Sequence, residues 1–225
     1  EVFRRIDDQV FETGRPNENE EVANDADGTP HIIITRKRLL HLPTADGDKP
    51  FIIASISDVT QIRGAEARAR YLASHDALTG LPNRSQFNDR LAEALELARR
   101  TGDHVAVLLL DLDGFKAIND THGHAAGDEV LRVVGRRLLT HVRVVDTAAR
   151  LGGDEFCVIQ VGVRQPDGAA ALAQRLVNAL KQPIAMAGET LAVSASIGVV
   201  VFPEDADDPE ALLKAADVAL YKVKR

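Results

Sequence analysis

Apolar runs and turn-rich segments alternate in the first sixty residues in the manner of a small β structure. Residues 31–40 and 51–56 are strand-like runs, and the sequence Pro-Thr-Ala-Asp-Gly-Asp lies between them. Apolar and β-branched runs favour strands, and a short segment rich in Pro, Asp and Gly favours a turn. The pattern therefore predicts a β-hairpin.

Beyond residue 60 the apolar positions recur at helical spacing. Ile62, Ala65, Ala69 and Leu72 follow one another at spacings of three, four and three, which places them on one side of a helix. Such a stripe suits a short parallel coiled coil. A helix that packs on its own domain explains the same stripe equally well.

From residue 75 onward, helical and strand patterns alternate. In residues 86–100 the apolar side chains share one helix face, and residues 105–110 form a continuous apolar run typical of a buried strand. Further elements continue the alternation: helices over 127–141, 169–181 and 209–224, a hairpin over 147–161 that turns at a Gly-Gly pair, and a strand over 191–201. This order predicts an α/β (α+β) domain whose helices cover a central sheet.

Composition narrows the class of protein. The chain has 225 residues and a net charge of −7, which argues against a nucleic-acid binder because neutralising phosphates requires a basic surface. Its single cysteine, Cys157, lies in an apolar run, so we expect it in the core of a cytoplasmic protein. No apolar run approaches the ~20 residues that cross a bilayer, and we expect no membrane contact from this fragment.

Two acidic features fall at strand ends or turns, where open α/β sheets place their sites. Asp111, Leu112 and Asp113 end an apolar strand, where a hard divalent cation would offset the carboxylate charge; a solvated strand end is the alternative. Asp154 and Glu155 follow the Gly-Gly pair, whose tight turn leaves room for a ligand. If the two strands are neighbours, Asp111 and Asp154 can hold the paired ions of a phosphoryl-transfer site.

A third polar stretch covers residues 115–128. Asn119 and Asp128 are candidates for reading a guanine edge, because a carboxylate accepts from the ring N–H and the exocyclic amine while an amide supplies mixed donors and acceptors. The alternative is that Asp128 caps a helix after a turn at Gly123.

Taken together, these stretches resemble the GGDEF family of diguanylate cyclases. The motifs occur in one order along the chain: residues 76–84 (Asp-Ala-Leu-Thr-Gly-Leu-Pro-Asn-Arg), 111–116 (Asp-Leu-Asp-Gly-Phe-Lys), 119–120, 123–124, 127–128, 152–156 (Gly-Gly-Asp-Glu-Phe), 196–198 and 216–221. The resemblance implies a palm-like, nucleotide-cyclase-type sheet flanked by helices over residues 75–225, after a linker helix at 61–74.

The same resemblance assigns the catalytic and metal-binding residues. By it, Asp111 and Asp154 bind Mg²⁺ or Mn²⁺ with help from the backbone carbonyl of Leu112, and Glu155 assists attack by the 3′-hydroxyl. Each protomer of a homodimer would hold one GTP, and the two sites would face each other to form cyclic di-GMP.

Substrate-binding residues follow in the same way. Asn119 and Asp128 would recognise guanine, while Phe115, Lys116 and Lys224 fall at positions that meet the substrate in the family. The family's phosphate-binding Arg would lie four positions beyond Lys224, past the last residue, so we expect weaker GTP binding than in a longer parent chain. Both ends of the sequence look cut from within elements.

Arg143 and Asp146 match the R-x-x-D inhibitory site of the family, at its usual offset before the Gly-Gly pair. The resemblance implies that cyclic di-GMP binds there and inhibits turnover. If the segment is helical, Asp146 lies one turn from Arg143 and can accept from guanine; the alternative is an i,i+3 ion pair without a ligand.

Residues 1–60 resemble the C-terminal part of a PAS sensor domain, through Gly-Arg-Pro at 14–16, Asp-Gly at 27–28, the hairpin, and Asp-Val-Thr at 58–60. The resemblances predict a diguanylate cyclase regulated by a sensor. The alternative is a catalytically idle GTP-binding module that controls an attached cyclic di-GMP phosphodiesterase domain. A purely dimerising scaffold is disfavoured, because scaffolds of this family usually lose the signature carboxylates.

Overall fold

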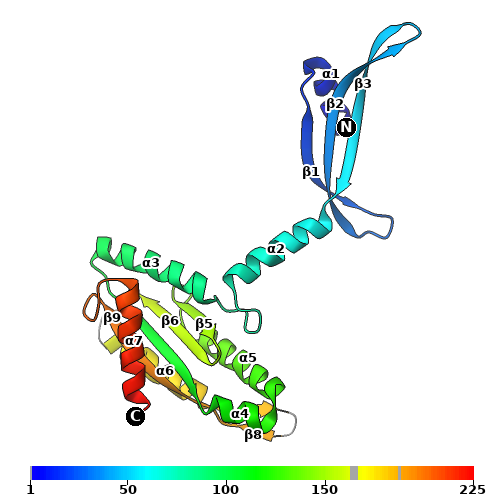
Figure 1. Cartoon of the computed structure of the whole chain (residues 1–225). Helices are drawn as coiled ribbons and strands as arrows, with labels where there is room; N and C mark the ends of the chain where they lie inside the picture. The colour runs from blue at the N-terminus through cyan, green and yellow to red at the C-terminus, as the bar shows by residue number, and fades with distance from the viewer. Residues whose placement is uncertain (1, 163–166, 187–188) are drawn as a thin grey trace. The chain divides into compact units, whose positions relative to one another are not determined.

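The computed structural model describes residues 2–162, 167–186 and 189–225, and it divides into two compact units, Glu1–Arg70 and Tyr71–Arg225 (Figure 1). No helix within these described ranges is long and apolar enough to cross a membrane.

In the N-terminal unit, one helix packs on a three-stranded antiparallel sheet. The strands β1 (Asn17–Asn24), β2 (Pro30–Thr44) and β3 (Gly47–Asp58) lie in that order, and α1 (Val2–Thr13) packs against β2 and β3. The predicted hairpin is confirmed as β2 and β3. The sequence did not predict α1 or β1; β1 is nearly all Asn and Glu, so it lacks the apolar alternation that marks a strand.

The helix α2 (Thr60–Ser74) covers the predicted stripe, yet none of its residues, all of them described, is buried. Ile62 is 59% exposed and Leu72 is 41% exposed. The alternative of a helix packed on its own domain is therefore wrong for this chain, and the coiled coil stays a prediction.

The C-terminal unit has a four-stranded antiparallel sheet in the order β5-β6-β4-β9. Its strands are β4 (Val105–Asp113), β5 (Thr147–Gly152), β6 (Glu155–Val161) and β9 (Ser194–Phe202). The strands β7 (Ile184–Met186) and β8 (Glu189–Leu191) pair in a separate two-stranded sheet. Its helices are α3 (Arg84–Thr101), α4 (Phe115–His122), α5 (His124–His141), α6 (Asp167–Leu180) and α7 (Pro209–Val223).

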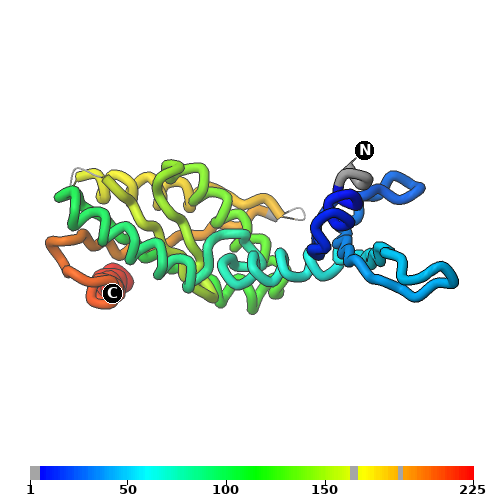
Figure 2. The backbone as a smooth tube through the Cα atoms, turned by 90° about the horizontal axis from the view of Figure 1, so that it is seen from above, coloured from blue at the N-terminus to red at the C-terminus, as the bar shows by residue number. Residues whose placement is uncertain are grey.

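Helices cover both faces of this sheet (Figure 2). On one face, Leu108 and Leu110 of β4 pack in the cluster that contains α5 and α6; on the other, Val107 and Leu109 pack in the cluster that contains α3 and α7. Burial on both faces explains why this strand reads as a continuous apolar run. The buried Cys157 belongs to the second cluster, and burial raises the pKa of its thiol, as expected of a core cysteine.

Three local elements of the C-terminal unit differ from the sequence predictions. The short helix α4 was not predicted, and α5 begins at His124 directly after the turn at Gly123. Asp128 therefore lies inside α5, and the prediction that it caps this helix is wrong. The segment from Arg143 to Asp146 forms a turn and not a helix, with the Asp146 N–H donating to the Arg143 carbonyl at 3.0 Å.

Candidate functional site

The two acidic features lie on neighbouring strands. Asp111 on β4 is the register partner of Glu155 on β6 and of Ser196 on β9. Between β5 and β6 the chain turns through Gly152 and Gly153, whose φ angles of 146° and 52° suit glycine. The hairpin returns close enough for the Leu112 N–H to donate to the Asp154 carbonyl at 3.4 Å.

A cavity of about 520 Å³ opens at this end of the sheet. Its lining combines two strand ends, the start of α4 and the end of α7: Asp111, Leu112, Asp113, Gly114, Phe115, Lys116, Asp154, Ser196, Val223 and Lys224. The lining contains every residue for which the sequence predicts a role in metal or phosphate binding. Lys224 reaches Asp111, with 2.5 Å between Nζ and Oδ1.

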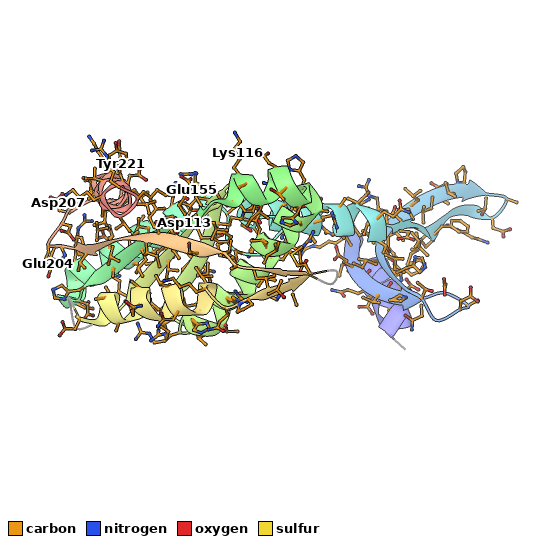
Figure 3. All side chains as sticks on the ribbon, turned by 90° about the horizontal axis from the view of Figure 1, so that it is seen from below. Asp113, Lys116, Glu155, Glu204, Asp207 and Tyr221 are labelled. Atoms are coloured by element: carbon orange, nitrogen blue, oxygen red, sulfur yellow. The ribbon has the colours of Figure 1, made fainter. Side chains whose placement is uncertain are left out.

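Asp113 has a different environment from Asp111, although both end the same strand. Its two carboxylate oxygens accept hydrogen bonds from Ser194 Oγ and Ser196 Oγ on β9, each at 2.8 Å. These bonds fix the end of β4 just before α4 begins, and Lys116 projects from α4 into solvent (Figure 3). Asp113 therefore holds the edge of the cavity in shape.

The two residues predicted to read guanine lie outside this cavity, where α4 meets α5. The backbone of Gly127 approaches the Asn119 side chain so closely that a methyl group at Gly127 would lie 2.0 Å from Asn119 Oδ1. Asp128, the next residue of α5, is half-buried. Helix crossing at a glycine thus fixes where the Asn119 amide can lie.

Glu155 faces a second, smaller cavity of about 120 Å³ with a partner that sequence reasoning missed. Arg84 at the start of α3 donates from Nη2 to Glu155 Oε2 and from Nε to the Leu151 carbonyl, both at 3.3 Å. Asp217 of α7 lines the same cavity. Arg84 and Asp217 both lie in motifs that the sequence resemblance identified, but the sequence assigned no role to either residue.

A second missed pair supports the Gly-Gly turn. Arg150 donates from Nη1 to both carboxylate oxygens of Asp76 at 3.0 Å, and from Nη2 to the Gly153 carbonyl at 2.7 Å. Burial acts to raise the pKa of Asp76, but hydrogen bonds from Thr79 and Arg150 outweigh it and hold that pKa below its ordinary value. The turn that presents Asp154 is thereby tied to the segment before α3.

At the predicted inhibitory site, Arg143 and Asp146 form an ion pair. Arg143 donates from Nη2 to Asp146 Oδ1 at 2.9 Å and from Nε to Oδ2 at 3.1 Å, and the Val161 N–H also donates to Oδ1. The Asp146 side chain is 1% exposed, whereas that of Arg143 is 50% exposed. Asp146 is thus placed to orient Arg143, and only Arg143 is open to a ligand.

Hard oxygen donors make the first cavity a fit for Mg²⁺ or Mn²⁺. Mg²⁺ typically takes one or two carboxylates and fills its other positions with water and substrate phosphates. Asp111 and Asp154 supply two carboxylates, and the described residues contain no group of three His, Cys, Asp or Glu side chains that could hold a metal. The Lys224 ammonium beside Asp111 shows that this carboxylate accepts a cation.

A larger cavity of about 640 Å³ lies between α3 and the edge strand β5. Its lining is mostly apolar, including Leu97, Val105 and Ile159, and contains none of the predicted site residues. The candidate site is therefore the 520 Å³ cavity, which contains the carboxylates and lysines although it is the smaller of the two.

Comparison with known proteins agrees with this geometry. A family model described as "Diguanylate cyclase, GGDEF domain" matches residues 73–225. The bifunctional diguanylate cyclase/cyclic di-GMP phosphodiesterase MucR of Pseudomonas aeruginosa is 44% identical over 165 residues, covering 73% of this chain and 24% of MucR. Diguanylate cyclase TpbB of the same species is 42% identical over 166 residues, covering 73% of this chain and 38% of TpbB. The chain spans well under half the length of these relatives.

Solved structures give the same picture of the C-terminal unit. A sensory box/GGDEF family protein from Caulobacter crescentus is 47% identical with a TM-score of 0.65, covering 67% of this chain and 97% of that one. The coiled coil and GGDEF domain of DgcB from C. crescentus, solved in complex with c-di-GMP, is 29% identical with a TM-score of 0.66, covering 74% of this chain and 88% of that one.

Proposed function

The chain belongs to the GGDEF family of diguanylate cyclase domains, and we propose that it condenses two GTP molecules into cyclic di-GMP as a homodimer. The observation that carries this proposal is the 520 Å³ cavity, whose lining includes both proposed metal ligands, Asp111 and Asp154, and two lysines. A triphosphate needs cations, and the carboxylates provide oxygen ligands for a divalent one. When bound there, Mg²⁺ or Mn²⁺ supplies positive charge beside the phosphates.

The chain's own residues orient the nucleotide. Lys116 and Lys224 offset phosphate charge, with Phe115 beside them, and Asn119 and Asp128 read the guanine edge. An adenine in the same place would leave the Asp128 carboxylate without its N–H donors, which costs ~1–3 kcal/mol or more for a charged group. GTP is therefore the substrate that the polar groups select.

Glu155 is the proposed acceptor for the proton of the 3′-hydroxyl. In each half-reaction the 3′-oxygen of one GTP attacks the α-phosphorus of the other, and the bond from that phosphorus to the pyrophosphate oxygen breaks. Two such steps release two pyrophosphates and close the ring. Because each protomer contributes one nucleotide, two copies must face each other.

Two regulatory roles follow as proposals. The N-terminal unit, a sheet with one helix, is proposed as part of a PAS sensor that acts through α2. Arg143, held by Asp146 and half-exposed, is proposed to grip a phosphate or the Hoogsteen edge of cyclic di-GMP in bidentate fashion through Nη1 and Nη2. For this, Nη2 has to leave the Val161 carbonyl, to which it donates at 2.7 Å. DgcB, with which this chain shares its GGDEF fold, has been solved with c-di-GMP bound.

A second candidate function is an idle GTP-binding module that regulates a phosphodiesterase. The specific observation in its favour is that cyclic di-GMP phosphodiesterase NbdA of Pseudomonas aeruginosa, which is named for the phosphodiesterase activity alone, is 44% identical over 166 residues, and these cover 21% of its length. In that case the cavity would bind GTP without turnover.

Incubation of the protein with GTP and Mg²⁺, followed by chromatography of the products, separates the two functions. The proposed enzyme forms cyclic di-GMP, and Asp111→Asn and Asp154→Asn each abolish it while the thermal unfolding midpoint stays close to that of the wild type. Bound but unconverted GTP in the wild type would favour the regulatory module. Undiminished cyclisation in either variant would refute the metal-ligand assignment.

A further inference from the structure

The ion pair between α7 and β4 places a positive charge on a proposed metal ligand. Lys224 follows the last turn of α7, and its N–H donates to the Leu220 carbonyl at 3.2 Å, so the helix fixes its backbone. Its Nζ lies 2.5 Å from Asp111 Oδ1. The Asp111 side chain is 17% exposed and that of Lys224 is 38% exposed, so water screens this pair only in part.

Close packing of α7 on β9 sets the reach of this lysine. A methyl group at Gly198 of β9 would lie 2.5 Å from the Ala216 carbonyl oxygen and 2.5 Å from the Leu220 nitrogen. The helix backbone therefore rests directly on the strand next to β4. Lys116 lines the same cavity but projects into solvent (Figure 3), so the two lysines are not equivalent toward Asp111.

An ammonium group and a divalent ion compete for one carboxylate oxygen. Mg²⁺ approaches its oxygen ligands to ~2.1 Å, and an ammonium already at hydrogen-bond distance from the same oxygen would lie within a few ångströms of that ion. Like charges at such a separation repel strongly where water is partly excluded. Metal binding at Asp111 Oδ1 thus requires Lys224 to leave.

We infer that Lys224 is the resident counter-ion of Asp111, and that the metal displaces it toward the triphosphate. The inference rests on the proposed function, because it takes Asp111 as a metal ligand. Without nucleotide, the lysine opposes metal binding, since it loses its carboxylate and gains no new partner. With nucleotide, the displaced ammonium gains the phosphates. Metal and triphosphate therefore bind with positive coupling, and each strengthens the other by the same factor.

Binding of Mn²⁺ without nucleotide, followed by electron paramagnetic resonance, tests the displacement. We expect Lys224→Gln to bind Mn²⁺ about threefold to fivefold more tightly than the wild type, the range that corresponds to the loss of a partly screened ion pair. Lys222→Gln, which removes the same charge from an exposed position in the last turn of α7, is the matched control and should bind Mn²⁺ like the wild type. Adding Asp111→Asn to Lys224→Gln should weaken binding again.

A nucleotide arm tests the coupling. Guanosine 5′-(α,β-methylene)triphosphate, which cannot be cyclised, should tighten Mn²⁺ binding by a larger factor in the wild type than in Lys224→Gln. Equal or weaker Mn²⁺ binding in Lys224→Gln, or an equal gain in Lys222→Gln, would overturn the inference while leaving the proposed function intact. Absence of Mn²⁺ binding by both the wild type and Lys224→Gln, with and without nucleotide, would overturn both.

Discussion

Replacement of Gly127 by alanine should weaken recognition of guanine without unfolding the protein. The added methyl group would lie 2.0 Å from Asn119 Oδ1, 2.9 Å from Asn119 Cγ and 3.2 Å from Phe115 Cζ. Contacts of a Cβ atom below 3.0 Å are essentially never found, so the Asn119 amide must move by about 1 Å or more. A shift of that size takes the side chain into another rotamer and breaks any hydrogen bond that it makes to a base.

The size of the effect of Gly127→Ala on stability and on GTP binding depends on which atoms the new methyl group meets. The struck atoms belong to the end of a side chain, so α4 and α5 can keep their positions, and alanine favours a helix interior over glycine by ~1 kcal/mol. We therefore expect a small change in the free energy of unfolding. Loss of the Asn119 contact should cost ~1–1.5 kcal/mol of GTP binding, which is about a tenfold increase in Kd. ATP binding should change much less.

Titration calorimetry with GTP and ATP measures this difference, and a double-mutant cycle assigns it. In an Asn119→Ala background the methyl group at Gly127 meets no amide, so the effect of Gly127→Ala on GTP affinity should disappear. Gly64→Ala, on a glycine with no atom within 4 Å of the added methyl group, is the control for the substitution itself. Unchanged GTP affinity in Gly127→Ala, or an equal loss in the Asn119→Ala background, would refute the reasoning.

Other changes test three further contacts. Arg143→Ala should let cyclic di-GMP accumulate further before turnover stalls, with the initial rate little changed; superimposable progress curves would show that product does not act there. Asp76 has a lowered pKa in the folded state, so its contribution to stability is present above the ordinary value of 3.8 and is lost as pH falls through the folded-state pKa. In urea unfolding, the stability gap between the wild type and Asp76→Asn should shrink below about pH 4; a gap independent of pH would contradict this. Gly198→Ala should destabilise the fold by ~1–3 kcal/mol, because the methyl group meets helix backbone, and a denaturation midpoint equal to that of Gly64→Ala would contradict it.

The pattern of apolar residues predicted the elements that are buried on both faces or along one stripe. The strand β4 is buried on both faces and reads as an unbroken apolar run, and α3 buries one stripe that begins at Phe87. The strand β1 was missed because polar residues dominate it. The helix α1 was missed although Phe3, Ile6 and Val10 recur at helical spacing. The apolar pattern also missed α4, a short helix that begins within a motif read for its chemistry.

The predicted site residues were named by their motifs, but their partners were not. Arg84 and Glu155 are 71 positions apart, and Asp76 and Arg150 are 74 positions apart. Spacing rules for helices and strands cover neighbours within a few residues, so they carry no information about such pairs. Both pairs depend on the way in which the segment before α3 meets the end of the β5-β6 hairpin.

The different partners of Asp111 and Asp113 depend on how the neighbouring strand β9 pairs with β4. The two residues share a strand and a face, because they are two positions apart. Pairing with β9 sets Ser194 and Ser196 against Asp113, and Gly198 on that strand lets α7 come close enough for Lys224 to reach Asp111. A strand that carries no proposed catalytic group therefore determines which carboxylate is tied to the protein and which is left to exchange a lysine for a metal. Shifting its register by one residue would turn both serines to the other face of the sheet and remove that distinction.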